Sequence, residues 1–344
     1  MRGACALTVA AIVVSSCSQQ SLRASSQSNK TMNHLHKGGH ATTEANRSGT
    51  SSTNRRAPSV PAFRHIFLVV MENLGYNAAM KVPALARLAH RYASATQYYA
   101  VAHPSLPNYI ALTSGSTSGI HSDCTSCRVS AMNLGTQLSA AHLSWNAYME
   151  GLPGPCFLGP YAPAGDYAGK HNPFRYFTQI RSSPSACSHI QPLSKLEQAL
   201  QSRTSSVPRF SWITPDMCND GHDCSAQTAG QWLDGLVKKI TSSNAYRNGG
   251  VIFITWDEGS FGDTRGVSPA GTGAVLNGSG GGHVLTLVIA AGLSAGLKVA
   301  THYDHYSILA TVEDAFRLPL LANAAARGTR PMSAFWSTSK TQRP

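Results

Sequence analysis

Four short apolar runs, separated by segments with helical spacing, most constrain what this chain can fold into. Each run is nearly continuous in hydrophobic residues, as in strands that are buried on both faces of a sheet. The runs are His65–Met71, Arg209–Thr214, Val251–Trp256 and His283–Ala290. Between them, apolar residues recur every three or four positions, which predicts amphipathic helices at residues 78–92, 193–200, 226–240 and 306–316. The alternation predicts an α/β fold with a mostly parallel central sheet flanked by helices.

The composition fits a folded body at residues 62–344. Hydrophobic residues make up 42% of the 344-residue chain and charged residues only 13%, which suits a sizeable core. The glycine-rich stretch 259–282 interrupts the pattern and is predicted to be a surface loop. We therefore expect a single large domain from residue 62 onward.

Residues 1–17 have the features of a signal peptide. An early Arg2 precedes an apolar stretch from Ala4 to Val14, which is too short for a membrane span and suits a signal sequence. The end of this stretch, Val14-Ser15-Ser16-Cys17, resembles a bacterial lipobox, in which Cys17 would be lipidated and anchor the protein to a membrane. A plain secretory signal is the alternative. Either way we expect an exported bacterial protein, held at the cell envelope or secreted.

Residues 18–61 are predicted to be a disordered, Ser/Thr-rich tether. They lack apolar periodicity and cannot bury a core. Residues 1–64 hold eight of the 28 Lys and Arg but one of the 16 acidic residues, so the net charge of +12 belongs largely to this arm. No basic helix with interleaved aromatic residues is present, so we expect no nucleic-acid partner. The charge favours anionic surfaces or substrates.

Cysteine content agrees with export. The body contains six cysteines, an even number that favours disulfides in an exported chain. Six cysteines allow 15 pairings, and spacing alone suggests Cys124–Cys127, Cys156–Cys187 and Cys218–Cys224. A zinc site at Cys124 and Cys127 is the alternative, although a second pair at finger-like spacing is missing.

Polar side chains follow three of the predicted strands. Glu72-Asn73 follows the first, the segment 215–224 (PDMCNDGHDC) follows the second, and Asp257-Glu258 follows the third. In parallel sheets, ligands bind beyond the carboxyl ends of the strands. Several carboxylates at one edge would repel each other unless a cation lay among them. The pattern therefore predicts an oxygen-rich metal site.

Ser105 is the candidate nucleophile. It precedes Leu-Pro-Asn and a helix-like run, so it is predicted to be the N-cap of a helix. Free backbone N–H groups and the positive end of the helix dipole at that position suit a phosphate group. Beside a divalent cation, the hydroxyl would lose its proton more easily. The alternative is a purely structural helix cap.

Six ordered motifs resemble the bacterial phosphoesterase family. This family includes acid phosphatases and phospholipase C-type enzymes and belongs to the alkaline phosphatase superfamily, which implies an alkaline phosphatase-like fold. The resemblance covers roughly residues 64–322 and is specific for the family but not for a substrate. The motifs are VVMEN (69–73), HPSLPNYIALTSG (103–115), KHNPFRYF (170–177), SWITPDMCNDGHDC (211–224), TWDEG (255–259) and HYSILATVEDAF (305–316).

The resemblance implies a divalent metal ion of uncertain identity. It places Glu72, Asn73, Asp257 and Glu258 at the metal, with Ser105 facing it as the phosphorylated nucleophile. The wider superfamily more often has Asp-His where this chain has Asp257-Glu258, so a single ion, or a second weaker site, fits better than a two-zinc site of the alkaline phosphatase kind. Another departure is an aspartate at position 216, where the family often has asparagine.

The same resemblance suggests phosphate-binding and acid–base residues. It implies phosphate contacts for Asn108, Lys170, His171 and His283, together with backbone N–H groups at the helix start. Catalytic roles are implied for Ser105, Asn108, His171 and His222. One of the two imidazoles would protonate the leaving alcohol. His103 also lies in a family motif, whereas His302 and His305 are weaker candidates. His305 is instead predicted to begin a helix beside the site.

The expected function is metal-dependent hydrolysis of phosphate monoesters through a phosphoserine, as in acid phosphatases. One alternative is a phosphodiesterase of the phospholipase C type acting on phospholipid head groups. Another is an envelope binding protein whose catalytic centre has decayed, which the joint retention of the acidic residues and Ser105 argues against. The physiological substrate, the pH optimum and the oligomeric state stay open.

Overall fold

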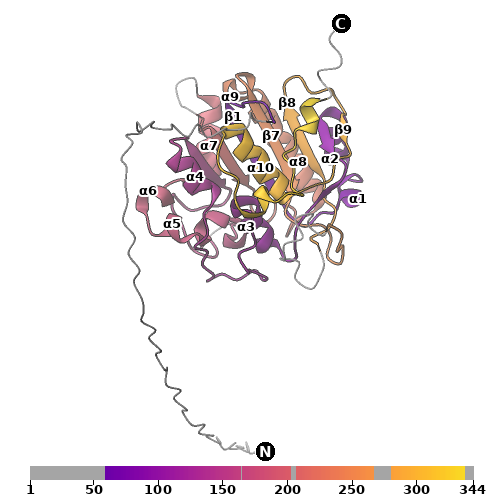
Figure 1. The fold of residues 1–344 in the computed structure, drawn as a ribbon. Helices are drawn as coiled ribbons and strands as arrows, with labels where there is room; N and C mark the ends of the chain where they lie inside the picture. Colours follow the sequence, from indigo (N-terminus) through magenta and orange to yellow (C-terminus); the bar gives the residue numbers. More distant parts are fainter. Residues whose placement is uncertain (1–58, 164, 203–206, 267–279, 338–344) are drawn as a thin grey trace, which may run out of the picture. The chain divides into compact units, whose positions relative to one another are not determined.

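The structure is a computed structural model that describes residues 59–163, 165–202, 207–266 and 280–337 (Figure 1). Its strands are β1 (His65–Met71), β2 (Ala93–Ala95), β3 (Tyr98–Tyr99), β4 (Trp145–Met149), β5 (Ile190–Pro192), β6 (Phe210–Thr214), β7 (Gly250–Trp256), β8 (Thr286–Ala290), β9 (Lys298–Val299) and β10 (Tyr303–Asp304). Its α-helices are α1 (Tyr76–Ala79), α2 (Pro83–Arg91), α3 (Ser105–Ser114), α4 (Leu134–Ala140), α5 (Thr178–Arg181), α6 (Pro184–Cys187), α7 (Leu193–Gln201), α8 (Ala226–Thr241), α9 (Asn244–Arg247), α10 (His305–Phe316) and α11 (Ala334–Ser337).

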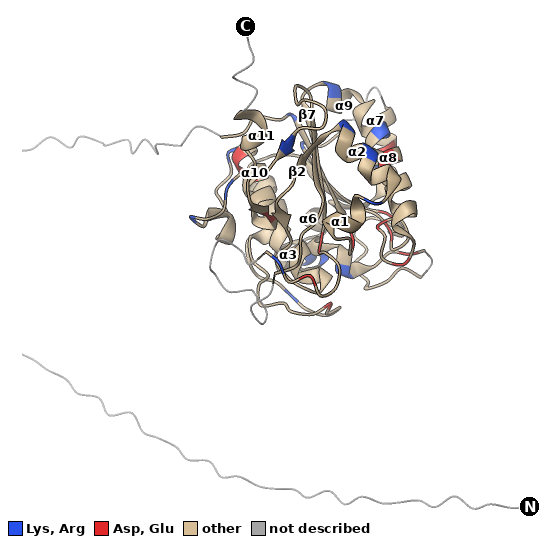
Figure 2. Cartoon of the chain, turned by 90° about the vertical axis from the view of Figure 1, so that its right-hand side faces the viewer, with Lys and Arg blue, Asp and Glu red and all other residues tan. Residues whose placement is uncertain are grey.

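Within the described residues, eight strands form one sheet in the order β5-β4-β6-β1-β7-β8-β2-β9. Pairing is parallel except where β8 runs antiparallel to β7 and β2. Helices α3 and α10 cover one face, and α2, α7, α8 and α9 cover the other (Figures 1 and 2). The central strands β1, β6 and β7 are buried almost throughout. The predicted mostly parallel sheet flanked by helices is confirmed.

Two predicted elements differ from the structure in their bounds. The helix predicted at 78–92 is two helices, α1 and α2, because Pro83 lacks an N–H and begins α2 at its first turn. The strand predicted from His283 begins only at Thr286. His283 and Val284 instead form isolated bridges with Tyr99 and Gly75, which turn this segment away from the main ladder.

The disulfides follow the pairing that spacing suggested. Cys124–Cys127, Cys156–Cys187 and Cys218–Cys224 are all bonded in the structure. The zinc alternative at the first pair is therefore wrong, because both thiols are used by the disulfide. The last pair closes a short loop that contains His222.

The predicted signal peptide, Cys17 and residues 18–58 of the predicted tether lie outside the described residues. The description begins at Ser59, whose backbone amide and hydroxyl both donate to the Asp314 carboxylate at 2.6 and 2.9 Å. Val60 is buried. Among the described helices, none is both long enough and apolar enough to cross a membrane.

A buried carboxyl on α10, Glu313, gives the fold a pH dependence of its own. Burial raises the pKa of Glu313 from 4.5 to about 9, while its Oε1 accepts a hydrogen bond from the Leu321 amide at 3.1 Å. The folded chain thus holds a proton that the unfolded chain has released between these two pH values. The resulting contribution to stability is complete below pH 4.5 and is lost as pH rises toward 9.

We expect Glu313→Gln to reduce this loss of stability, because the amide keeps an acceptor for Leu321 and does not titrate. The slope for one group is at most about 1.4 kcal/mol per pH unit. Denaturant unfolding at pH 5, 7 and 9 measures it in both proteins. Parallel pH dependences would show that Glu313 does not hold the extra proton.

Candidate active site at the carboxyl edge of the sheet

The carboxyl ends of β1 and β7 place two acidic residues side by side. The strands pair in parallel, with Met71 opposite Trp256, so Glu72 and Asp257 leave the sheet at the same level. The Asp257 amide donates to the carbonyl oxygen of Met71 at 2.9 Å, and the Glu72 amide donates to that of Asp220 at 3.1 Å. Asp220 follows β6. The strand ends therefore converge as parallel-sheet geometry requires, at the lower end of the sheet in Figure 2, where Asp and Glu positions gather.

Asn73 makes the turn that joins the two carboxylates. Its φ of 53° is in the left-handed region, which asparagine tolerates better than most residues. In this conformation its amide donates to Asp257 Oδ1 at 3.0 Å, and its side-chain Nδ2 donates to Glu72 Oε2 at 3.2 Å. Both acidic side chains are thereby oriented by one residue.

The hydroxyl of Ser105 points at these carboxylates. Ser105 is buried, and its Oγ donates to Glu72 Oε2 at 3.0 Å and lies 3.5 Å from Glu258 Oε1. The hydroxyl, three carboxylates and Asn73 therefore form one cluster, which we call the acidic cluster (Glu72, Asn73, Ser105, Asp257 and Glu258).

Ser105 does not cap its helix, so that prediction is wrong. The N-cap of α3 is Pro104, and Ser105 is the first helical residue. The next amide, on Leu106, donates to the Asp123 carboxylate at 3.0 Å, and Pro107 has no N–H to offer. The start of α3 thus has fewer free N–H groups for a phosphate than predicted. The Ser105 hydroxyl, in turn, is free of a capping role.

Negative charge is crowded in the acidic cluster. Burial, together with the charges of Glu72 and Glu258, raises the pKa of Asp257 well above its usual value. Burial also raises the pKa of Glu258, although a hydrogen bond from His103 opposes this. Asp257 Oδ2 is buried without a hydrogen-bond partner among the described residues. An unpaired buried oxygen beside two further carboxylates fits a bound cation.

His171 lies between two acidic residues. Its Nε2 is 3.1 Å from Glu72 Oε1 and its Nδ1 is 3.0 Å from Asp220 Oδ2. Burial alone would lower the pKa of His171, but these carboxylates raise it to about 9. Burial would likewise raise the pKa of Glu72, yet His171, with help from a Tyr109 hydrogen bond, lowers it to about 2. The two side chains form a buried ion pair.

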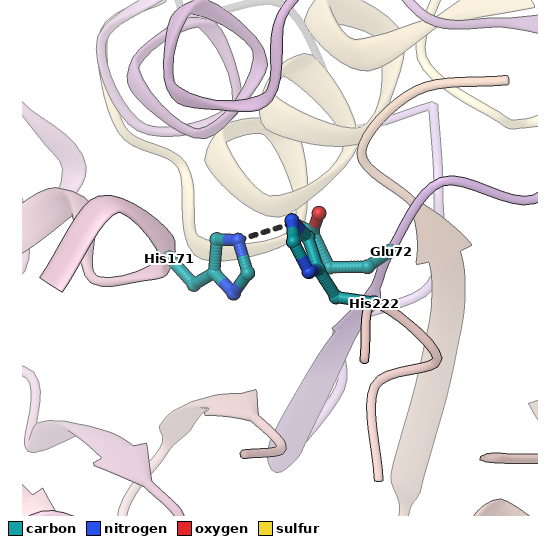
Figure 3. Close-up of side chains that lie close together, drawn as sticks. All are labelled: Glu72, His171 and His222. Atoms are coloured by element: carbon teal, nitrogen blue, oxygen red, sulfur yellow. Dashed lines mark ion pairs between the residues drawn. The ribbon is translucent and has the colours of Figure 1, made fainter. Parts of the chain in front are cut away.

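A second group that could hold a metal is formed by Glu72, His171 and His222. Each offers one ligand atom, and these atoms lie within 4.8 Å of one another (Figure 3). His222 Nδ1 is 2.6 Å from Asp223 Oδ1, and its Nε2 is 3.0 Å from the Lys170 ammonium. Because an ammonium only donates, Nε2 accepts this hydrogen bond.

The two candidate metal sites share Glu72 but differ in what a cation would displace. In the histidine group, a metal would have to break the His171–Glu72 ion pair and remove Lys170 from His222 Nε2. In the acidic cluster, Asp257 Oδ2 has no hydrogen-bond partner among the described residues, whereas Glu72 Oε2 would give up its bonds from Ser105 and Asn73. Both groups are therefore candidates, and the oxygen donors of the acidic cluster suit a hard divalent ion.

Two residues expected at the phosphate lie elsewhere or are already bonded. Asn108 Oδ1 accepts from the amides of Val101 and Ala102 at 3.0 Å each, and its Nδ2 donates to the carbonyls of Ala102 and Pro104. Its amide thus holds the turn before Ser105. His283 Nε2 is 3.0 Å from the Thr96 carbonyl, and its ring stacks on Tyr76. In the contacts among described residues, His283 does not touch the acidic cluster.

Lys170 and His103 lie beside the site from different loops. Lys170 Nζ is 3.3 Å from Asp123 Oδ2 in addition to its contact with His222. His103 Nδ1 is 2.5 Å from Glu258 Oε2, and this contact raises the pKa of His103. The structure therefore brings Lys170, His171, His222 and His103 to the edges of the acidic cluster.

Sequence reasoning missed three side chains of the site. The Tyr109 hydroxyl donates to Glu72 Oε1 at 2.7 Å, Asp220 pairs with His171, and Asp123 caps α3 while holding Lys170. Tyr109 is four residues after Ser105 on one helix, so the helical period could have indicated it. Asp220 lies two residues before His222 in a motif that was singled out. Only a structure could show Asp123.

His305 begins α10, as predicted, and lies behind the site. Asp304 caps the helix through the Ser307 amide, and the buried His305 Nε2 is 2.5 Å from the Asp257 carbonyl oxygen. The Tyr98 hydroxyl contacts His305 Nδ1 at 3.1 Å. Burial lowers the pKa of His305 to about 4, so its imidazole is neutral at neutral pH and ties α10 to the end of β7.

Comparison with known proteins shows which proteins the chain resembles. The chain is 30% identical over 266 residues to a probable acid phosphatase from Kluyveromyces lactis. This alignment covers 76% of this chain and 60% of the yeast protein. The chain is 28% identical over 284 residues to a phosphatidylinositol-3-phosphatase from Mycobacterium tuberculosis, covering 81% of this chain and 85% of that protein. The chain thus spans only about three fifths of the yeast relative.

Solved structures show the fold. A protein of the alkaline phosphatase superfamily from Vibrio parahaemolyticus superposes with a TM-score of 0.51 at 11% identity, over 76% of this chain and 68% of that chain. The model of the phosphoesterase family matches residues 16–319, which is most of the chain. With its alkaline phosphatase-like fold and its clustered motif residues, the chain belongs to the phosphoesterase family.

Proposed function

We propose that the chain is an exported, divalent-metal-dependent hydrolase of phosphate monoesters that works through a phosphoserine at Ser105. The observation that carries the proposal is the buried Ser105 hydroxyl, which contacts the carboxylates of Glu72 and Glu258 at 3.0 and 3.5 Å. A serine that acts in acyl transfer is instead bonded to an imidazole or amine base. Carboxylates around a hydroxyl suit a metal-assisted nucleophile.

The acidic cluster provides the ligands for the cation. The cation would be held by oxygens of Glu72, Asn73, Ser105, Asp257 and Glu258. Among the described residues, Asp257 Oδ2 has no hydrogen-bond partner that the cation would have to displace. When bound, a divalent cation lowers the pKa of the Ser105 hydroxyl and neutralises charge on the phosphoryl oxygens.

The side chains then perform the transfer. Ser105 Oγ attacks phosphorus in line, the bond from phosphorus to the ester oxygen breaks, and the hydroxyl proton is released to water, while Glu72 Oε2 orients the hydroxyl as its hydrogen-bond acceptor. Tyr109 and His171 hold Glu72 in place. The leaving alcohol takes a proton from an imidazolium at the rim, for which His222 is the candidate once its Nε2 is protonated and releases the hydrogen bond from Lys170. Water then hydrolyses the phosphoserine and restores Ser105.

Positive side chains near the cluster would bind the phosphate. Lys170 is partly buried between Asp123 and His222, so its ammonium is held close to the site. This ammonium supplies a cationic hydrogen-bond donor for a dianionic monoester, whereas both ring nitrogens of His171 face Glu72 and Asp220. Positive charge beside the phosphate favours a monoester over a diester, which carries a single negative charge.

The relatives and the sequence suggest where such substrates would be met. Three disulfides fit an exported protein. The matching relatives have the names of phosphatases, and one of them is a phosphatidylinositol-3-phosphatase, which is named after a phosphorylated lipid. If Cys17 is lipidated, the enzyme would work at a membrane surface, where both lipid phosphates and soluble monoesters are present.

A two-substrate assay with chelator tests this function. We expect turnover of p-nitrophenyl phosphate, a fall of about 100-fold or more with EDTA, and recovery on adding divalent ions. Bis-p-nitrophenyl phosphate should react far more slowly. Preferred turnover of the diester would support the phospholipase C alternative. No turnover of either substrate with metals supplied would support a binding protein, and unchanged activity in EDTA would contradict the metal.

A further inference from the structure

Phe261 is the most exposed of the large hydrophobic side chains that the structure describes. Its side chain is 98% exposed, whereas the other exposed ones, Met132, Tyr161 and Leu320, range from 42% to 61%. A phenylalanine left in water forgoes roughly 2–3 kcal/mol of burial free energy. Such a residue beside a catalytic site is a candidate for contact with a ligand.

The ring stands at the rim of the acidic cluster. Phe261 follows Glu258 by three residues, and its ring centroid is 6.3 Å from that of His103. His103 Nδ1 is 2.5 Å from Glu258 Oε2, and Glu258 Oε1 is 3.5 Å from Ser105 Oγ. Glu258 and His103 therefore lie between the nucleophile and the exposed ring of Phe261.

Hydrogen bonds on both sides fix the loop that carries the ring. Before Phe261, the Gly259 amide donates to the Gly281 carbonyl at 2.7 Å; after it, the Asp263 amide donates to Ser260 at 2.9 Å and closes the turn. The Asp263 carbonyl accepts from His103 Nε2 at 2.9 Å, and its carboxylate accepts from the His283 amide at 3.1 Å. The turn therefore holds Phe261 at a fixed place next to His103.

We propose that the Phe261 ring packs against the apolar part of the leaving alcohol. The favoured substrates are then phosphate monoesters of aryl or long-chain alcohols. The inference rests on the proposed function. The side chains between Ser105 and Phe261 are Glu258 and His103, which are polar and would lie next to the phosphoryl group of a bound substrate. Beyond them Phe261 offers an apolar face to whatever the phosphate is attached to, whether a soluble alcohol or a lipid chain.

Hexyl phosphate and ethyl phosphate test this contact, because their leaving groups have nearly equal basicity and differ in apolar length. We expect Phe261→Ala to lower kcat/KM for hexyl phosphate about tenfold, mainly through KM, and for ethyl phosphate less than twofold. Inhibition by inorganic phosphate should not change. Phe261→Trp should retain the preference. Leu320→Ala, another exposed apolar residue that follows α10 and lines a separate pocket, is the matched control and should alter neither substrate.

Other outcomes would overturn the assignment. Equal losses on both substrates would mean that Phe261 only supports the His103 loop, and no loss would mean no contact. Sedimentation with vesicles of phosphatidylcholine and phosphatidylglycerol identifies a different role: loss of vesicle binding in Phe261→Ala, with an unchanged hexyl-to-ethyl ratio, would make it a membrane contact. If the wild type turned over neither ester, the proposed function itself would fail, and this assignment with it.

Discussion

Ser105→Ala is expected to lower turnover of p-nitrophenyl phosphate by about 1,000-fold or more. The hydroxyl is buried and contacts Glu72 and Glu258, and no other described hydroxyl occupies this position. Substrate binding should weaken much less, because the cationic side chains that face the phosphate stay. Steady-state kinetics with the metal-loaded protein measures both effects.

The matched control is Ser114→Ala on the same helix. Ser114 is also buried, but its hydroxyl donates to backbone carbonyls at the far end of α3. We expect this variant to lose some stability and keep its kcat. Activity in Ser105→Ala within tenfold of the wild type would remove Ser105 from the reaction, whereas equal losses in both variants would indicate damage to α3.

Asp257→Asn is expected to weaken divalent-metal binding and lower activity by at least about 100-fold. The variant removes one of three crowded carboxylates while keeping an oxygen that can accept from the Asn73 amide. Without metal, the variant should be more stable than the wild type at pH 8. The buried carboxyl of the wild type must either repel its neighbours or take up a proton, and the amide does neither.

Isothermal titration calorimetry and thermal unfolding, with and without a divalent ion, measure this prediction. Metal should raise the unfolding temperature of the wild type and leave that of the variant nearly unchanged. Asp234→Asn on α8 is the control, because this acidic residue pairs with Lys238 on the surface. Equal metal stabilisation of Asp257→Asn and the wild type would place the ion elsewhere, and the histidine group would be the next candidate.

Much of the frame could be predicted because it depends on patterns that are local in the chain. Apolar runs indicated the central strands, and the polar residues after them indicated one edge of the sheet. That argument brought Glu72 and Asp257 together correctly, since parallel strands that pair in register end at the same level. The order of the cysteines gave the right disulfides because each bond joins two cysteines that follow one another along the chain.

The finer arrangement depends on contacts that no local pattern contains. The helix α3 begins one residue earlier than the spacing suggested, and Asp123, 17 residues after Leu106, accepts from the Leu106 amide in its first turn. Asn108 lies in a family motif, yet its amide is fully used in backbone hydrogen bonds.

The most direct measurement maps the phosphorylated residue. Metal-loaded protein would be mixed with p-nitrophenyl phosphate, quenched in acid within the first turnovers, digested and examined by mass spectrometry. We predict one added phosphoryl group on the peptide that carries Ser105, and none in Ser105→Ala. A phosphoryl group on His222 or another residue, or steady turnover with Ser105 never modified under any quench time, would contradict the account.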